Sequence, residues 1–260
     1  MSAKIISIVN QKGGVGKTTT AVNLATIFAV MDKKVLLIDL DSQGNTSSGL
    51  GIRQEQRKVT AYHLFCGLSS IDKAIYSTEI PDLSIITSNT NLAAIEVELL
   101  DKEDHELILK NLLSQVSEAY DYVIIDCPPS LNLLTLNALV ASNEVIIPML
   151  CDFYSLEGLS HLLKTIEIVE KKLNPQIKVG GILFTMYDKR NRLTEQVEKD
   201  VRSCLGDMVY NVTIPRNVRV SEAPSHGKSV IIYDHKCSGS LAYISLAKEI
   251  IAKEEHQLIK

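Results

Sequence analysis

Residues 12–19 read KGGVGKTT and bring three glycines, two lysines and two threonines into one short run. At the glycines we expect backbone angles that other residues resist, so that successive N–H groups can converge on phosphate oxygens. Lys17 would add a full positive charge, and the Thr18 hydroxyl suits Mg²⁺. The run predicts a phosphate-binding loop made of Lys12, Gly13, Gly14, Val15, Gly16, Lys17, Thr18 and Thr19.

The neighbours of this run support the same interpretation. The β-branched segment Lys4–Val9 precedes it and predicts a strand, and the pattern after it predicts a helix from Lys17 to Met31. A strand, a glycine-rich loop and a helix in this order are the context of a P-loop. The N-terminal end of that helix would direct its positive dipole at the bound anion.

Two further predicted strands lead into carboxylates. Lys34–Asp39 is followed closely by Asp41, and Tyr122–Asp126 ends in Asp126 itself. Open parallel sheets bind ligands at the carboxyl ends of their strands, so both side chains should lie on the side of the phosphate loop. We predict that Asp126 holds Mg²⁺, directly or through water, and that Asp41 orients the water that attacks phosphate. An N-cap role for Asp41 in the next helix stays open.

The alternation of apolar strands with helical patterns predicts the fold class. We expect an α/β fold with a doubly wound, mostly parallel sheet and helices on both faces. No repeat or boundary divides residues 1–260, which predicts a single P-loop ATPase domain, and the polar segment Gly49–Thr60 predicts a loop. The other expected strands are Leu83–Thr87, Glu144–Pro148, Val179–Met186 and Met208–Ile214; the other expected helices are Asp104–Ala119, Leu156–Leu173, Leu193–Leu205 and Leu241–Glu255.

Composition narrows the class of protein. The 260 residues are 45% hydrophobic and 22% charged, which excludes a disordered or fibrous chain. No apolar run approaches the roughly 20 residues that span a bilayer, and no signal peptide is recognised, so we expect a cytoplasmic protein. The five cysteines form no CxxC pair and are expected to be reduced.

The net charge of −4 is unevenly distributed along the chain. Residues 92–121 hold eight acids against two lysines, so they carry −6 and the remaining residues carry +2. Global charge therefore does not exclude a local basic patch.

Nearly the whole chain, the phosphate loop included, resembles the ParA/Soj-type chromosome-partitioning ATPases, in their short form without an N-terminal DNA-binding extension. The stretches that carry the resemblance are Asn10–Ala25, Val35–Gly51, Tyr120–Leu139, Tyr154–Leu163 and Ile214–Asp234, and the last is the most specific to this branch. KGGVGKTT is similar to the deviant Walker A motif. The extra lysine of that motif reaches across a dimer to the nucleotide of the partner, and the resemblance implies this role for Lys12. A solvated surface lysine is the alternative.

The resemblance implies an ATP-driven switch that uses ATP and Mg²⁺ and has weak basal hydrolysis. Two subunits would sandwich two ATP molecules, and this homodimer would bind double-stranded DNA without sequence preference and associate with the nucleoid. A centromere-binding partner of the ParB/Spo0J type would stimulate hydrolysis and release the DNA. By similarity, Asp41 polarises water, Asp126 serves Mg²⁺, and Met186, Pro215 and Asn217 lie near the adenine.

The resemblance also places DNA-contacting arginines at Arg190 and Arg219. The cationic set around them is Lys189, Arg190, Arg192, Arg216, Arg219, Lys228 and Lys236, from which we take Arg190, Arg219, Lys228 and Lys236 as DNA-binding candidates. Contact with phosphates needs only positive charge, and the affinity that it gives falls steeply with salt. A dimer would double the number of cationic residues that face the duplex. Ordinary solvated surface residues are the alternative.

Three positions depart from the pattern of the family. Ser42 stands where proline is usual, Asn132 replaces a common glycine, and His235 follows Asp234 where proline is usual. None of them touches the phosphate chemistry. They are expected to affect loop dynamics and DNA affinity.

Other classes of protein remain as alternatives. A MinD-like membrane-surface ATPase would end in a basic amphipathic helix, but Glu249, Glu254 and Glu255 lie among the last lysines, so no membrane binding is expected. A metal-cluster carrier of the nitrogenase-iron-protein kind would need cysteines that bridge two subunits, and spacing alone leaves this open for Cys127 and Cys151. A nucleotide-gated scaffold with negligible turnover is a further alternative.

Overall fold

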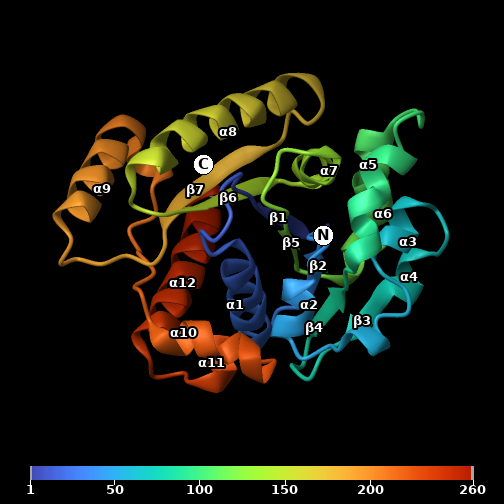
Figure 1. The fold of residues 1–260 in the computed structure, drawn as a ribbon, viewed down its shortest axis with the longest axis horizontal. Coiled ribbons are helices and arrows are strands. Elements are labelled where there is room, and N and C mark those ends of the chain that lie inside the picture. The colour runs from blue at the N-terminus through green and yellow to red at the C-terminus, as the bar shows by residue number, and fades with distance from the viewer. Residues whose placement is uncertain (1, 259–260) are drawn as a thin grey trace.

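A seven-stranded sheet runs through the centre of the described part of the chain (Figure 1). The computed structural model describes residues 2–258. The strand order is β3-β4-β2-β5-β1-β6-β7, and every neighbouring pair is parallel except β3 and β4. The strands are β1 Lys4–Ile8, β2 Val35–Asp39, β3 Ile75–Ser77, β4 Leu83–Ile86, β5 Tyr122–Asp126, β6 Glu144–Met149 and β7 Lys178–Phe184.

Helices cover both faces of the sheet, which confirms the predicted fold class. α1 and α12 pack with strand residues such as Ile6 and Leu37 on one face, whereas α6, α7 and α8 pack with Leu36 and Val123 on the other (Figure 1). Because both faces are covered, the strands are almost continuously apolar. The helices are α1 Lys17–Val30, α2 Asn45–Gly49, α3 Ala61–Phe65, α4 Ile71–Ala74, α5 Ile95–Glu98, α6 Ile108–Leu113, α7 Leu133–Ala141, α8 Phe153–Lys172, α9 Arg192–Leu205, α10 Val218–Glu222, α11 Val230–Tyr233 and α12 Ser238–Leu258.

The register of the central strands brings the predicted site together. Asp126 at the end of β5 pairs with Asp39 at the end of β2 and with Ile8 at the end of β1. The loop from β1 to α1 therefore starts beside two carboxylates. This edge of the sheet is where parallel α/β folds bind their ligands.

The predicted strand Met208–Ile214 is wrong. This segment forms no continuous ladder with β7. The N–H groups of Tyr210 and Ile214 donate to the carbonyls of Ile182 and Phe184 on β7. Isolated bridges set Val209 opposite Ile182 and, just beyond both segments, Pro215 opposite Tyr187. Between them, the backbone N–H groups of Asn211 and Val212 donate to the carboxylate of Glu249 on α12. A ladder cannot form through donors that are already paired with a helix side chain.

The predicted helix Asp104–Ala119 is broken into three pieces. Short 3₁₀ turns, His105–Leu107 and Ser117–Ala119, flank α6. After α6, the hydroxyl of Ser114 donates to the carbonyl of Asn111, and such side-chain bonds compete with the helix. The sequence also did not reveal β3, a short antiparallel edge strand.

Candidate functional site

The phosphate loop is open at the start of α1. Gly16 occupies the N-cap with φ 86°, no side chain caps the helix, and Gly14 has φ 73°. These left-handed angles are unfavourable for residues with a Cβ, so glycine is required at both positions. For Gly13 the predicted reason is wrong, because its φ is not in that region. The uncapped first turn presents N–H groups that an anion can bind.

Lys17 lies inside the site rather than on its surface. Its side chain folds back over the loop, and Nζ donates to the carbonyl oxygen of Lys12 at 3.0 Å. The residue is only 6% exposed. Burial lowers the pKa of Lys17, and the nearby carboxylate of Asp126 opposes that shift. The position suits a charge that exchanges a carbonyl partner for a phosphate oxygen.

Asp126 is buried and accepts two hydroxyl hydrogen bonds. Its Oδ2 accepts from Thr18 Oγ1 at 2.7 Å and from Thr46 Oγ1 at 2.5 Å. Its Oδ1 has no partner among the described residues. Burial, followed by the charge of Asp39, raises the pKa of Asp126 to about 7. A nearby cation would favour its ionised form.

These oxygens fit the predicted magnesium site. Mg²⁺ prefers oxygen ligands and in nucleotide sites uses one or two carboxylates, a hydroxyl and phosphate oxygens. The Thr18 hydroxyl and the unpartnered Oδ1 of Asp126 supply such donors at the first turn of α1. The two residues chosen from the sequence for Mg²⁺ are thus in direct contact.

Asp39 is a second buried carboxyl beside Asp126. Its Oδ2 accepts from the backbone N–H of Ser47 at 2.9 Å and from the Ser47 hydroxyl at 2.7 Å. Burial raises the pKa of Asp39 to about 6. These bonds tie the end of β2 to α2 and hold the intervening loop at the site.

Asp41 does not cap the helix that follows it. Gly44 is the N-cap of α2, so the N-cap alternative is wrong. The Oδ1 of Asp41 accepts from the N–H of Gln43 at 3.0 Å, and the side chain is only partly buried. A carboxylate in this position is accessible to water at the mouth of the site.

Lys12 is paired within its own chain. Its Nζ lies 2.5 Å from Oδ2 of Asp152, and both side chains are about one-third exposed. Asp152 is also the N-cap of α8, where Oδ1 accepts from the N–H and the hydroxyl of Ser155. The lysine is therefore held near the loop by a partner that it must leave to reach another molecule.

The candidates for adenine contact line a cavity next to the loop. Met186, Pro215 and Asn217 share this space of about 270 Å³ with Gly16 and Thr19. Met186 has φ 49°, a strained left-handed angle for a side chain of its size. Such strain is typical of residues held in place at ligand sites.

Comparison with known proteins identifies the family. A family model described as an AAA domain matches residues 3–179. The chain is 49% identical over 259 residues to the chromosome partitioning protein ParA of Caulobacter vibrioides, which covers 99% of this chain and 97% of that protein. It is also 49% identical over 249 residues to the sporulation initiation inhibitor protein Soj of Bacillus subtilis, with 96% and 98% covered. The chain belongs to the ParA/Soj family of chromosome-partitioning ATPases.

Solved structures agree with this ParA/Soj assignment at the level of the fold. Cobyrinic acid a,c-diamide synthase from Mycobacterium smegmatis, with a bound ATP analog and magnesium, superposes with a TM-score of 0.83 at 32% identity, covering 95% of this chain and 93% of that one. The septum site-determining protein MinD of Pyrococcus horikoshii, complexed with Mg-ADP, gives 0.79 at 25% identity, with 95% and 96% covered. Both confirm the predicted P-loop architecture.

The four DNA-binding candidates of this ParA/Soj-family chain fall into two kinds. Arg190 is paired with Asp188 through two hydrogen bonds, and Arg219 is paired with Glu222. Lys228 and Lys236 are exposed, and among the described residues no carboxylate lies within 4 Å of either amine. A separate hollow of about 620 Å³ gathers Lys189, Arg190 and Arg216 beside the adenine candidates Pro215 and Asn217.

The segment after Asp41 contacts the C-terminal family motif directly. A Cβ built on Gly227 would lie 2.7 Å from Cα of Gly51, so the two backbones touch. Arg57 anchors the predicted loop Gly49–Thr60 by donating to Ser48 Oγ at 2.8 Å and to the carbonyls of Ile52 and Ser88. The segment that follows Asp41 and the turn that carries Lys228 are thus in direct backbone contact.

The sequence missed three functional-site residues. Thr46 contacts the site from α2 and Asp39 from β2, and Asp152 reaches it from the start of α8. Asp39 ends a strand, as Asp126 does, and that placement was the available signal. No local pattern indicated Asp152, because it lies 140 residues from Lys12.

Proposed function

We propose that this protein is a Mg²⁺-dependent ATPase that partitions DNA, as a chromosome or plasmid segregation factor. The observation that carries the proposal is the contact of Thr18 with Asp126 beside the buried Lys17, at the uncapped start of α1. This arrangement provides cation and phosphate ligands together. The chain matches members of its family over nearly their whole length, which supports DNA partitioning as the biological process.

The chemistry of ATP hydrolysis is assigned to four side chains. Lys17 and the N–H groups of the first turn of α1 bind the phosphates and offset the charge that develops on them. Thr18 and Asp126 would hold Mg²⁺, which supplies charge neutralisation when bound. Asp41 orients the attacking water from the mouth of the site. Met186, Pro215 and Asn217 enclose the adenine.

Assembly is assigned to Lys12. We infer that Lys12 leaves Asp152 when ATP is bound and contacts the phosphates of a second subunit, so that two chains enclose two ATP molecules. The pair is only part-buried, and ion pairs of that kind contribute about 1 kcal/mol or less, which a phosphate partner offsets easily. Dimerisation then presents two copies of the cationic region to one DNA duplex.

DNA binding is assigned to Arg190, Arg219, Lys228 and Lys236. Contact with phosphates alone gives no sequence preference, and two linked sites bind much more tightly than one. A ParB/Spo0J-type partner is proposed to stimulate hydrolysis, after which the dimer separates and the DNA is released. The protein would therefore act on the nucleoid in the cytoplasm. Among residues 2–258 no helix combines the length and apolarity that crossing a bilayer requires.

The proposal is tested with ATP turnover and dimer mass measured on the same variants. Asp41→Ala is expected to bind ATP, lose hydrolysis and accumulate as a dimer, whereas Lys12→Ala stays monomeric. Light scattering with a non-hydrolysable ATP analogue and Mg²⁺ gives the mass, and phosphate release gives the rate. Wild-type turnover in Asp41→Ala would refute the water-orienting role, and a wild-type protein that remains monomeric would refute the cycle.

Two controls separate the alternatives. Flotation with anionic liposomes and ATP would reveal a MinD-like membrane ATPase by recovery of the protein with lipid. Turnover that stays negligible after DNA and a ParB/Spo0J-type partner are added would indicate a nucleotide-gated scaffold. The proposed function predicts that the protein is not recovered with lipid and that DNA and the partner increase its turnover.

A further inference from the structure

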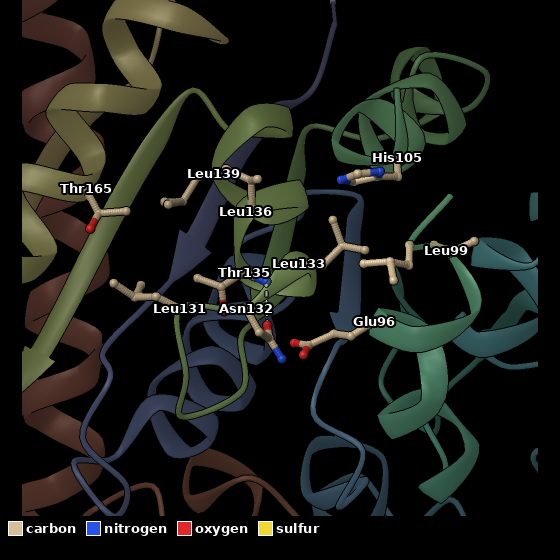
Figure 2. A pocket seen from close by; sticks show the side chains of 11 residues that line it. Glu96, Leu99, His105, Leu131, Asn132, Leu133, Thr135, Leu136, Leu139 and Thr165 are labelled. Atoms are coloured by element: carbon tan, nitrogen blue, oxygen red, sulfur yellow. Dashed lines mark hydrogen bonds between the residues drawn. The ribbon is translucent and has the colours of Figure 1, made fainter. Parts of the chain in front are cut away.

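The two helices that follow the buried carboxylates are anchored in different ways. After Asp126 the chain enters α7, which packs leucines against the core; Figure 2 shows Leu133, Leu136 and Leu139 of this helix. After Asp39 the chain enters α2, five residues that read NTSSG and include no hydrophobic residue. Burial of apolar surface holds α7, whereas the position of α2 depends on hydrogen bonds.

Arg57 holds α2 from outside the helix. Its Nη2 donates to Ser48 Oγ at 2.8 Å and to the carbonyl of Ile52 at 2.7 Å, and its Nε donates to the same carbonyl at 3.1 Å. Its Nη1 donates to the carbonyl of Ser88 at 3.2 Å, two residues after β4 ends at Ile86. One planar group therefore joins α2, the segment after it and the end of β4.

The guanidinium of Arg57 also lies against the start of α2. A Cβ built on Gly44, the N-cap of this helix, would overlap Nη1 of Arg57. The hydroxyl of Ser48 donates to the carbonyl of Gly44 at 3.1 Å, and the N–H of Gly44 donates to the carbonyl of Asp41 at 2.9 Å. The contacts of Arg57 are thus continuous with the turn that carries Asp41.

The opposite side of α2 contacts the two buried carboxylates. The hydroxyl of Thr46 donates to Asp126, and the N–H and hydroxyl of Ser47 donate to Asp39. The hydroxyl of Ser47 also accepts from the N–H of Ser88 at 3.2 Å. A displacement of α2 would therefore move the hydroxyl that Asp126 accepts.

The partners of Arg57 indicate a geometric role rather than a role for its charge alone. The oxygens that accept from its guanidinium are neutral carbonyl and hydroxyl oxygens, and the residue is half-buried. Burial lowers the pKa of Arg57, and the charge of Asp39 opposes that shift. The planar fork of arginine can serve several fixed acceptors at once, which the single ammonium of lysine cannot do.

We propose that Arg57 is a positioning residue for ATP hydrolysis, which clamps α2 between the end of β4 and the buried carboxylates so that Thr46 stays on Asp126 and Asp41 stays at the mouth of the site. Loss of the clamp lowers the rate of hydrolysis but leaves ATP binding, because Lys17 and the N–H groups that bind phosphate belong to another segment. The effect on hydrolysis rests on the proposed ATPase function; the clamp itself does not.

The first experiment compares Arg57→Gln with Arg53→Gln in the full-length protein. The control makes the same change at an exposed arginine four residues away. Phosphate release at saturating ATP and Mg²⁺, normalised to ATP-binding sites, gives kcat, and a fluorescent ATP analogue gives the affinity. A misplaced catalytic group lowers the rate steeply, so in Arg57→Gln we expect kcat to fall about tenfold or more and the affinity to change less than about threefold. Arg53→Gln should match wild type in both.

Arg57→Lys separates geometry from charge. This variant keeps the charge but lacks the fork, so it should keep less than about one-third of the wild-type kcat. Wild-type turnover in Arg57→Lys or in Arg57→Gln would overturn the proposal. So would equal losses of kcat and affinity in Arg57→Gln, since the residue would then support the whole site.

A double-mutant cycle tests the connection through α2. Ser48→Ala removes the hydroxyl that lies between Arg57 and Gly44 and should lower kcat by less than Arg57→Gln does. The double variant should lose no more than Arg57→Gln alone, because both changes release the same helix. Losses that multiply would mean that the two residues act independently and would contradict the clamp.

Hydrogen exchange tests the clamp without hydrolysis. The amides of residues 44–52 should exchange about tenfold faster in Arg57→Gln than in wild type or Arg53→Gln. Unchanged exchange would overturn the clamp whatever the turnover. Faster exchange in Arg57→Gln, in a protein whose wild type hydrolyses no ATP, would support the clamp and remove the proposed function instead.

Discussion

The inner and outer charges of the nucleotide site are held in different ways. The inner set, Lys17, Asp39 and Asp126, is buried among hydroxyl and backbone partners, and all three pKa values are shifted by burial. The outer set includes Lys12 and Arg219, which are exposed or half-buried. Lys12 pairs with Asp152, and Arg219 pairs with Glu222 and Asp234, all within the same chain.

This difference separates what the fold determines from what binding must rearrange. Packing of the strands fixes the inner charges before any ligand arrives, so they are suited to chemistry that depends on position. Exposed ion pairs are weak and easily exchanged. The outer cations are therefore suited to partners that bind reversibly, as we propose for a second subunit and DNA.

The largest effect is expected for Lys17→Ala. A hydrogen bond from a charged donor contributes about 1.5–3 kcal/mol, so the affinity for ATP should fall about ten- to 100-fold. Equilibrium binding of a fluorescent ATP analogue with Mg²⁺ measures this loss. Lys34→Ala, which changes an exposed lysine after α1, is the control and should bind normally. Unchanged affinity in Lys17→Ala would contradict the assignment of the inner set.

Asp39→Asn should change how stability depends on pH. Burial raises the pKa of Asp39 from 3.8 to about 6, so between these values the folded protein keeps a proton that the unfolded chain releases. Its contribution to the free energy of unfolding is thus complete below pH 3.8 and is lost as pH rises through about 6, a decrease of about 3 kcal/mol at most. Urea denaturation across this range should show a smaller decrease in the variant. An identical pH profile would mean that Asp39 titrates normally.

Arg219→Glu should abolish ATP-dependent retention on DNA while nucleotide binding is kept. Loss of one phosphate contact per subunit should also lower the slope of log affinity against log salt by about 1 per subunit. Lys228→Glu is the informative comparison, because no carboxylate within the described chain offsets that lysine. Retention that is unchanged in both variants in a low-salt gel would remove the cationic region from DNA binding.

The smallest effect is expected for Asp152→Asn. The amide keeps an acceptor for the N–H of Ser155 and so keeps the cap of α8, but it removes the charge that holds Lys12. Dimerisation with ATP should become about fivefold tighter or less, because the pair that must break is partly exposed. Analytical ultracentrifugation measures the constant, and Asp152→Ala shows what loss of the cap adds. Weaker dimerisation in Asp152→Asn would mean that the pair serves assembly instead of opposing it.

The features that could be predicted from the sequence follow the same division between inner and outer charges. The phosphate loop, α1 and the strands that end at Asp39 and Asp126 were predicted because local patterns encode them. The pairing of Lys12 with Asp152 joins residues 140 positions apart, and no local sequence pattern indicates it. The error at Met208–Ile214 has a similar origin, since the N–H groups there are taken by Glu249 of a distant helix.

The contact between Gly51 and Gly227 has a mechanical consequence. Because main chain lies against main chain there, no rotamer change can absorb a displacement. A movement of the strand-end segment that follows Asp41 must therefore push the turn that carries Lys228. In the proposed cycle, the release of DNA would then depend on the spacing of two peptide backbones, and any side chain introduced at either glycine would hold them apart.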